Sequence, residues 1–178
     1  MSWGVIIFMR CFIAIDLNKE IKKKISEFQS SIKDTALRMV SPENLHITLL
    51  FLGEQSNEEI GRIDKHLKHI SFQPFTIKIQ GLGVFPNENL IRVLWLGIES
   101  PELIALARDI HKSLGKKYDF SAHLTIARAK GKLDRETTKK INKEIEIGCQ
   151  EVSSFRLKKS TLTPSGPVYE DVFAYNSI

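Results

Sequence analysis

Two short segments of the chain place a threonine two residues after a histidine. Residues 46–49 read His-Ile-Thr-Leu and residues 123–126 read His-Leu-Thr-Ile, so an aliphatic residue follows each polar one. Successive side chains of a strand point to opposite faces, so each histidine shares a face with its threonine while the aliphatic pair lies on the other. The pattern predicts two strands, each with one face for the core and one for chemistry.

These residue types suit phosphoryl chemistry. Histidine gives or accepts a proton near neutral pH, so His46 and His123 facing each other across a cleft can act as one acid and one base. The hydroxyl groups of Thr48 and Thr125 can donate to non-bridging phosphate oxygens. Such a site can catalyse in-line displacement at a phosphodiester without a metal ion.

Other interpretations of the histidines are weaker. A single His-x-Thr segment is most often an ordinary half-exposed strand, but two copies in matching positions favour a shared site. As metal ligands, His46 and His123 would need partners, and no Asp, Glu or Cys stands at ligand spacing beside either. We therefore expect no metal and no cofactor. His66, His69 and His111 are expected to be solvated helix residues.

The elements around these segments recur in the same order. Strands are predicted at 10–17, 45–52, 75–79, 91–98, 122–129, 154–161 and 168–175, and helices at 18–33, 56–70, 101–116 and 134–145. Asn18 is a candidate N-cap, and Ser56 with Glu59 forms a capping-box pattern. A strand, a helix and a histidine strand follow one another twice, which indicates an internal pseudo-repeat.

The repeat also bears on the fold class. Alternating helices and strands usually indicate a parallel doubly wound sheet, but no Gly-rich phosphate loop follows any predicted strand. We therefore expect an α+β fold of two similar lobes. The 178 residues, 42% of them hydrophobic, suffice for one compact unit.

Composition limits the partners and the compartment. The 26 Lys and Arg against 21 Asp and Glu favour a polyanionic partner, although a merely solvated surface would give the same balance. Cys11 and Cys149 lie far apart and are expected to be reduced, buried thiols. The apolar start has no basic region before it and is interrupted by Arg10 and Asp16, so we expect neither a signal peptide nor a membrane span, and a cytoplasmic location.

The chain resembles the two-histidine (2H) phosphoesterase superfamily, and within it the RNA 2′,3′-cyclic phosphodiesterases first described as 2′-5′ RNA ligases. The segments that carry the resemblance are MRCFIAID at 9–16, ENLHITLLFLG at 43–53, GVFPN at 83–87, RVLW at 92–95, AHLTIAR at 122–128 and STLTPSGPVYE at 160–170. One departure is Ala122, where family members often have proline. Residues 1–8 fall outside the pattern and are a candidate extension of a single domain that spans 1–178.

The resemblance implies two pseudo-symmetric lobes, each an antiparallel sheet backed by helices, around a central cleft. It also implies hydrolysis of RNA 2′,3′-cyclic phosphate ends to 2′-phosphomonoesters, with His46 as the proton donor and His123 as the proton acceptor. The expected partner is an RNA with such an end, tRNA halves included, and the expected state is a monomer. ATP-independent 2′-5′ RNA ligation at the same site is an alternative, as is a non-catalytic RNA-binding module.

Four further residues have open roles. The resemblance favours Arg128 near the phosphate, but in a regular strand it lies on the opposite face from His123, which favours a surface or bridging role. Phe51 is expected in the core, with stacking on a base as the alternative. Lys158 and Lys159 are expected on a solvated strand edge, with guidance of the RNA backbone as the alternative.

Overall fold

The computed structural model describes residues 8–32, 34–87, 90–133, 137, 139 and 144–178. The elements follow one another as β1 (Phe8–Asp16), α1 (Lys19–Ser31), β2 (Leu37–Met39), a 3₁₀ turn (Pro42–Asn44), β3 (His46–Ser56), α2 (Asn57–Leu67), β4 (Phe75–Asn87), β5 (Leu90–Glu99), α3 (Pro101–Ser113), β6 (His123–Ala129), β7 (Glu146–Val152), β8 (Ser154–Thr163) and β9 (Gly166–Asn176).

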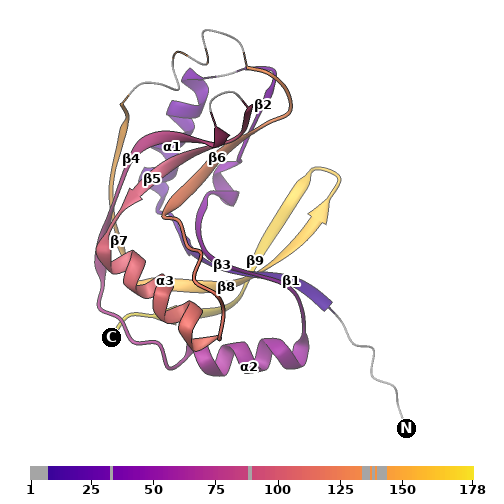
Figure 1. Ribbon diagram of the computed structural model, residues 1–178, viewed down its shortest axis with the longest axis vertical. Helices are drawn as coiled ribbons and strands as arrows, with labels where there is room; N and C mark the ends of the chain where they lie inside the picture. Colours follow the sequence, from indigo (N-terminus) through magenta and orange to yellow (C-terminus); the bar gives the residue numbers. More distant parts are fainter. Residues whose placement is uncertain (1–7, 33, 88–89, 134–136, 138, 140–143) are drawn as a thin grey trace.

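The strands form two antiparallel sheets. One has the order β3-β1-β8-β9 and the other the order β2-β6-β5-β4-β7. In Figure 1, α2 and α3 lie beside the first sheet at the bottom of the view, and α1 lies beside the second sheet at the top. The expected α+β fold of two sheets backed by helices is confirmed.

The two sheets do not correspond to the two halves of the sequence. Helix α1 follows β1 but packs on β6 and β7, and α3 follows β5 but also contacts β3. Strand β4 pairs with β5, and β8 returns to pair with β1. Each sheet and its helices therefore combine segments from both halves, and the strands β3 and β6 contact each other between the sheets.

Local signals account for the helix starts. The Asn18 side chain accepts a hydrogen bond from the Ile21 amide at 2.8 Å, as an N-cap should. The Ser56 and Glu59 side chains each bond the other's backbone amide, which completes the predicted capping box. Isoleucines at helical spacing then turn one face of α1 and of α2 into the core; in α1 these include the buried Ile25.

Several expectations were incomplete or wrong. Strands β2 and β7 were not predicted: β2 has three residues, too few for a periodic signal, and the alternation of β7 is broken by the buried Gln150. Gln150 is buried because its amide bonds the Asn18 amide and the Asp16 carbonyl. Cys149 is exposed rather than buried. The predicted helix at 134–145 lies largely outside the described residues.

The core is made chiefly of isoleucine and leucine side chains on the inner faces of the sheets and helices. Within the part of the chain that the structure describes, no helix has the length and apolar character needed to cross a membrane.

Candidate active site

The strand β3 contains a bulge directly after its His-x-Thr segment. Ala14 of β1 lies opposite Thr48, but the next residue back, Ile13, lies opposite Leu50. Leu49 is therefore an extra residue in β3. An extra residue of this kind reverses the alternation of side chains beyond it and re-aims them.

Strand β6 has the same irregularity at the same place. Trp95 of β5 lies opposite Thr125, while Leu94 lies opposite Ala127, so Ile126 is the extra residue. The burial pattern confirms the equivalence: in both strands the histidine and threonine are half-buried, the next two residues after the threonine are buried, and the following residue is exposed.

The bulges bring Phe51 and Arg128 to the histidine side of their strands. Each stands five residues after its histidine, where a regular strand would turn it to the opposite face. Beyond the bulge, Phe51 and Arg128 instead share a face with His46 and His123. The expectation that Phe51 lies in the core is wrong, since its side chain is 73% exposed.

The backbone orients both histidine rings in the same way. His46 Nδ1 lies 2.7 Å from the Asn44 carbonyl and His123 Nδ1 lies 2.8 Å from the Ser121 carbonyl, two residues before each histidine. A carbonyl oxygen only accepts, so Nδ1 carries the proton and Nε2 is the nitrogen that remains for chemistry. His46 Nε2 contacts the Thr48 hydroxyl at 3.0 Å.

The surroundings of His46 are aromatic and charged. Its ring packs on Phe12 at a centroid distance of 4.9 Å and meets the edge of Tyr169 at 5.2 Å. Burial lowers the pKa of His46, and the nearby ammonium group of Lys158 lowers it further. The hydrogen bond to the backbone and the carboxylate of Asp16 act in the opposite direction but do not compensate.

His123 stands in a different corner. Phe85 meets its ring edge-on at 5.4 Å, and Trp95 lies at 6.2 Å and stacks on Phe85. The Trp95 indole lies over Gly83, where an added Cβ would fall 2.1 Å from an indole carbon. Glycine at position 83 therefore allows the aromatic wall beside His123 to form.

Arg128 also acts across to the other sheet. Burial raises the pKa of the Tyr169 hydroxyl, and the Arg128 guanidinium opposes that shift. Tyr169 belongs to β9 and touches His46, so the arginine of the second segment acts on a residue beside the first histidine. None of the ion pairs among the described residues involves Arg128, which leaves its charge available to an anion.

The two lysines of β8 do not form a solvated edge. Lys158 is 8% exposed and pairs with Asp16 at 2.9 Å and with Asp171. Lys159 pairs with Glu170 at 3.0 Å. Both ammonium groups are thus already bound to carboxylates, which also weakens the case that they guide an RNA backbone.

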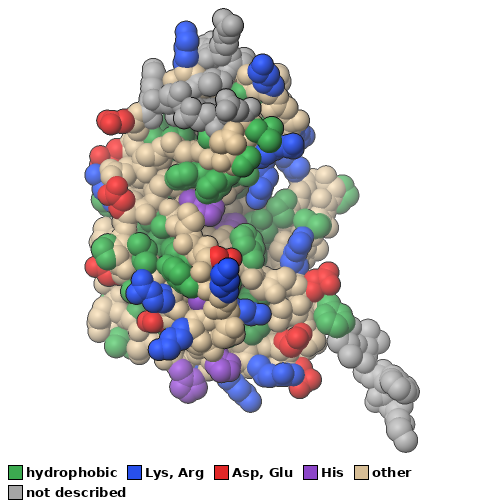
Figure 2. Space-filling view, viewed as in Figure 1, with side chains coloured by type: hydrophobic (Ala, Val, Ile, Leu, Met, Phe, Trp, Pro, Cys, Tyr) green, Lys and Arg blue, Asp and Glu red, His purple; other side chains and the backbone are tan. Residues whose placement is uncertain are grey.

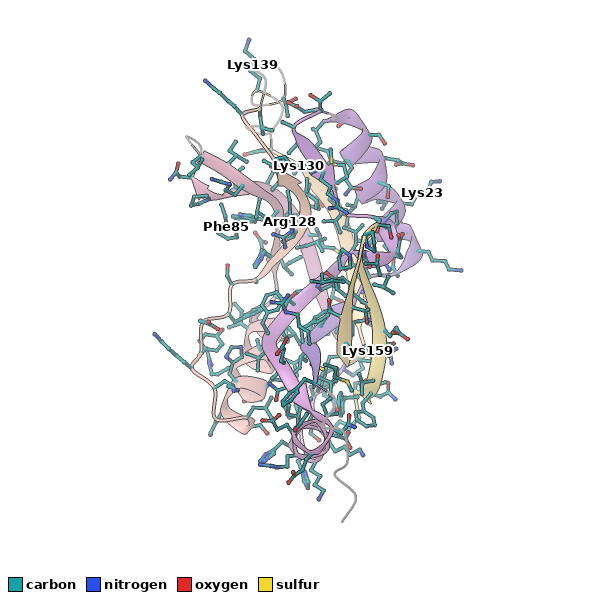
Figure 3. The ribbon with its side chains drawn as sticks, turned by 90° about the vertical axis from the view of Figure 1, so that its right-hand side faces the viewer. Lys23, Phe85, Arg128, Lys130, Lys139 and Lys159 are labelled. Carbon is teal, nitrogen blue, oxygen red and sulfur yellow. The ribbon has the colours of Figure 1, made fainter. Side chains whose placement is uncertain are left out.

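The figures show where the site lies. Figure 2 shows a hollow between the upper and lower parts of the molecule, with histidine side chains at its bottom and hydrophobic groups beside it. In Figure 3, Arg128 and Phe85 lie at the same level of the molecule, whereas Lys23 projects from the outer side of α1. Within the described ranges, no group of three His, Cys, Asp or Glu side chains is arranged to hold a metal ion.

The other histidines differ from expectation in one case. His111 is 1% exposed, and its ring nitrogens face the Lys117 carbonyl at 2.8 Å and the Leu49 carbonyl at 3.0 Å, so it is not a solvated helix residue. Helical spacing could have shown this, because His111 follows the buried Leu103 and Ala107 on the face that α3 turns toward β3.

Comparison with known proteins gives consistent matches. The family described as LigT-like phosphoesterase matches residues 15–95. A protein of Archaeoglobus fulgidus named RNA 2′,3′-cyclic phosphodiesterase is 42% identical over 92% of this chain and 98% of its own length. A Methanocaldococcus jannaschii protein of the same name is 38% identical over 91% and 97%.

Solved structures agree with these matches. The crystal structure of TT0787 of Thermus thermophilus has a TM-score of 0.83 and 30% identity, covering 94% of this chain and 97% of that one. E. coli LigT complexed with 3′-AMP has a TM-score of 0.81 and 26% identity, with 96% and 99% covered.

Proposed function

The chain belongs to the LigT-like phosphoesterase family, and from that premise we propose that it hydrolyses 2′,3′-cyclic phosphate ends of RNA to 2′-phosphomonoesters without a metal ion. Curated relatives that match this chain over nearly their full length are named RNA 2′,3′-cyclic phosphodiesterase. The observation that carries the proposal for this chain is the matched pair of histidines, each with Nδ1 held by a carbonyl and Nε2 left for proton transfer.

The proposed reaction uses the two Nε2 atoms in turn. His123 Nε2 takes a proton from water as the oxygen attacks phosphorus, and His46 Nε2–H gives a proton to the departing ribose 3′-oxygen. The bond between phosphorus and the 3′-oxygen breaks, and the phosphate remains on the 2′-oxygen. No described residue hydrogen-bonds His123 Nε2, which suits a base that must reach a water molecule.

Three side chains are proposed to stabilise the phosphate. The hydroxyl groups of Thr48 and Thr125 lie beside the histidines on the same face, and Arg128 joins them because of the bulge in β6. Hydrogen-bond donors and a fixed positive charge stabilise the charge that develops on the non-bridging oxygens. Phe51, exposed at the equivalent place in β3, offers a ring face to the base of the terminal nucleotide.

The lowered pKa of His46 fits a donor that is charged by its substrate. In the free protein, burial favours the neutral ring. A cyclic phosphate carries a negative charge, and an anion beside the imidazole favours the protonated form. Binding of the substrate therefore supplies the condition under which His46 holds the proton that it must deliver.

Replacing each histidine by alanine tests the division of labour. On the natural cyclic substrate, His46→Ala and His123→Ala should each lose on the order of 10² to 10⁴ in rate. A phosphodiester with a nitrophenolate leaving group needs little protonation, so His46→Ala should recover much of its loss there. His123→Ala should stay slow, because water must still be activated.

The rates of both variants are measured on both substrates and compared with those of the wild type. Equal losses on the activated ester would refute the separate roles, and recovery of His123→Ala alone would reverse them. A wild-type protein that fails to hydrolyse cytidine 2′,3′-cyclic phosphate would refute the proposed function itself.

A further inference from the structure

The two bulges free backbone carbonyl groups that need donors. A bulge interrupts the ladder of hydrogen bonds, and a buried carbonyl without a partner costs free energy. Leu49 and Ile126, the extra residues of β3 and β6, are both buried. Their carbonyls are bonded by side chains that come from outside their own sheets.

His111 of α3 holds the first bulge. Its Nε2 lies 3.0 Å from the Leu49 carbonyl, and its Nδ1 lies 2.8 Å from the Lys117 carbonyl. Carbonyl oxygens only accept, so a ring nitrogen of His111 that carries a proton donates it to the oxygen that it faces. Asp119 stands 4.0 Å from Nδ1, and the Tyr118 ring meets the imidazole edge-on.

Gln29 of α1 holds the second bulge. Its Nε2 donates to the Ile126 carbonyl at 2.8 Å and to the Val40 carbonyl at 2.9 Å. The Val40 amide also donates to the Ile126 carbonyl, at 2.9 Å. The side chain is 5% exposed, so these bonds form away from water, where an unsatisfied partner is most costly.

The two contacts are equivalent and crossed. The helix that follows β1 supplies the donor for the bulge of β6, and the helix that follows β5 supplies the donor for the bulge of β3. In each case the held residue lies two positions before the side chain that the bulge re-aims, Arg128 in β6 and Phe51 in β3.

We propose that Gln29 and His111 are positioning residues for the cyclic-phosphate reaction, an inference that rests on the proposed function. Gln29 keeps the bulge that aims Arg128 at the phosphate, and His111 keeps the bulge that aims Phe51 at the base. Without Gln29, the Ile126 carbonyl keeps only the Val40 amide as a donor and the Val40 carbonyl loses the glutamine side chain. Without His111, the Leu49 carbonyl loses its side-chain partner. Each strand can then relax toward the regular alternation that turns the side chain to the other face.

Double-mutant cycles test this pairing. Gln29→Met keeps the length of the side chain but removes the donor, and we expect a loss of roughly tenfold to a hundredfold in kcat/KM. That loss should largely vanish when Arg128 is already alanine, yet persist when Phe51 is already alanine. His111→Asn should show the reverse pattern, and His111→Gln, which can place an amide near the Nε2 position, should restore most of the activity.

Gln150→Met is the matched control. It also removes a buried glutamine that bonds backbone across the two sheets, but its partners are Asn18 and Asp16 rather than a bulge. Its effect should add independently to Arg128→Ala and to Phe51→Ala. If Gln29→Met and His111→Asn behave like Gln150→Met, the inference is refuted.

A second measurement does not depend on turnover. The Nε–H resonance of Arg128 should shift in Gln29→Met and the ring resonances of Phe51 should shift in His111→Asn, with little crossover between the pairs. An inactive wild type would refute the proposed function and leave this measurement to decide the inference. Active wild type with equal shifts in both variants would refute the inference alone.

Discussion

Lys158 is the cation that lowers the pKa of His46 most, and it belongs to a network of two acids and two bases on the same face of the sheet. Its ammonium group lies 2.9 Å from Asp16, and Arg156 lies 3.6 Å from the same carboxylate. Asp171 pairs with both bases. The protonation of His46 therefore depends on Lys158 and Asp16, whose side chains are held in place by their ion pairs.

The pH dependence of kcat/KM should report the lowered pKa of His46. A proton donor must be charged, so kcat/KM falls as pH rises through the pKa of the donor in the free enzyme. Because burial and Lys158 lower that pKa, the fall should begin at a lower pH than for an ordinary imidazole. The fall in kcat should lie at higher pH, because bound phosphate favours the protonated ring.

Replacing Lys158 by methionine should shift the alkaline limb of the pH profile, the fall of kcat/KM with rising pH, to higher pH. Loss of the ammonium leaves Asp16 free to raise the pKa of His46, so the alkaline fall of kcat/KM should move to higher pH. Lys159→Met removes an adjacent charge that pairs with Glu170 instead, and it should not move the limb. A shift of equal size in both variants would mean that the net charge of the protein, and not the proximity of Lys158, lowers the pKa of His46.

Activity should survive exhaustive chelation. In the proposed mechanism, two histidines and the donors around them supply the proton transfers and charge stabilisation that a metal would otherwise provide. The measurement is turnover of cytidine 2′,3′-cyclic phosphate after dialysis against EDTA. Loss of turnover that one added divalent metal restores would contradict the metal-free mechanism.

At the residue scale, the sequence predicted that each histidine shares a strand face with its threonine, but it could not predict the course of each strand beyond that threonine. The His-x-Thr pattern identifies a face by simple alternation, and the structure keeps that alternation through Thr48 and Thr125. A bulge depends on how the neighbouring strand is aligned, so the aim of Arg128 and the exposure of Phe51 were not predictable from their own strands.

At the scale of elements, the pairing of β4 with β5 builds the wall beside His123. Gly83 stands opposite Trp95, and its missing side chain makes room for the indole. Trp95 in turn stacks on Phe85, and both rings contact His123.

Gly83→Ala should therefore reduce both stability and activity. The added methyl would overlap the indole, and overpacking of this kind costs about 1 to 3 kcal/mol. Displacement of Trp95 should also disturb His123 and lower kcat. Gly61→Ala, in α2 where the added methyl meets no atom within 4 Å, should instead raise the free energy of unfolding by roughly 0.5 to 1 kcal/mol. Urea unfolding and steady-state kinetics of both variants give the comparison. Unchanged kinetics in Gly83→Ala would contradict the claim that Trp95 positions His123.

The elements themselves were largely predictable, because capping residues and isoleucine spacing are local signals. Ser56 and Glu59 show this for α2. Which sheet an element joins is not local. Nothing in the residues of α1 says that it covers the other sheet, and the repeat suggested lobes without showing that they exchange segments.

At the scale of the whole molecule, that exchange should make unfolding a single transition. In a Trp3→Phe variant, Trp95 is the one remaining tryptophan and reports on the second sheet. Tyr175→Phe removes the 3.1 Å hydrogen bond that the Tyr175 hydroxyl of β9 donates to the buried Asp64 of α2. This change lies in the first sheet and the helix beside it. It should lower stability by about 1 to 2 kcal/mol and shift the Trp95 transition by the same amount as the far-UV circular dichroism transition. A Trp95 transition that stays in place would show that the sheets unfold separately.

The crossing of helices also constrains how a molecule of this kind could arise by gene duplication. A single ancestral half would hold one histidine strand and a helix that, like α1 and α3 here, contacts the histidine strand of the other half. The helix of such a half would find the strands that it covers in a second copy, so two copies would exchange helices in a domain-swapped dimer. The symmetric dimer would already carry both histidines in one shared site, and fusion of the two genes would then free each strand to diverge, as Phe51 and Arg128 have done.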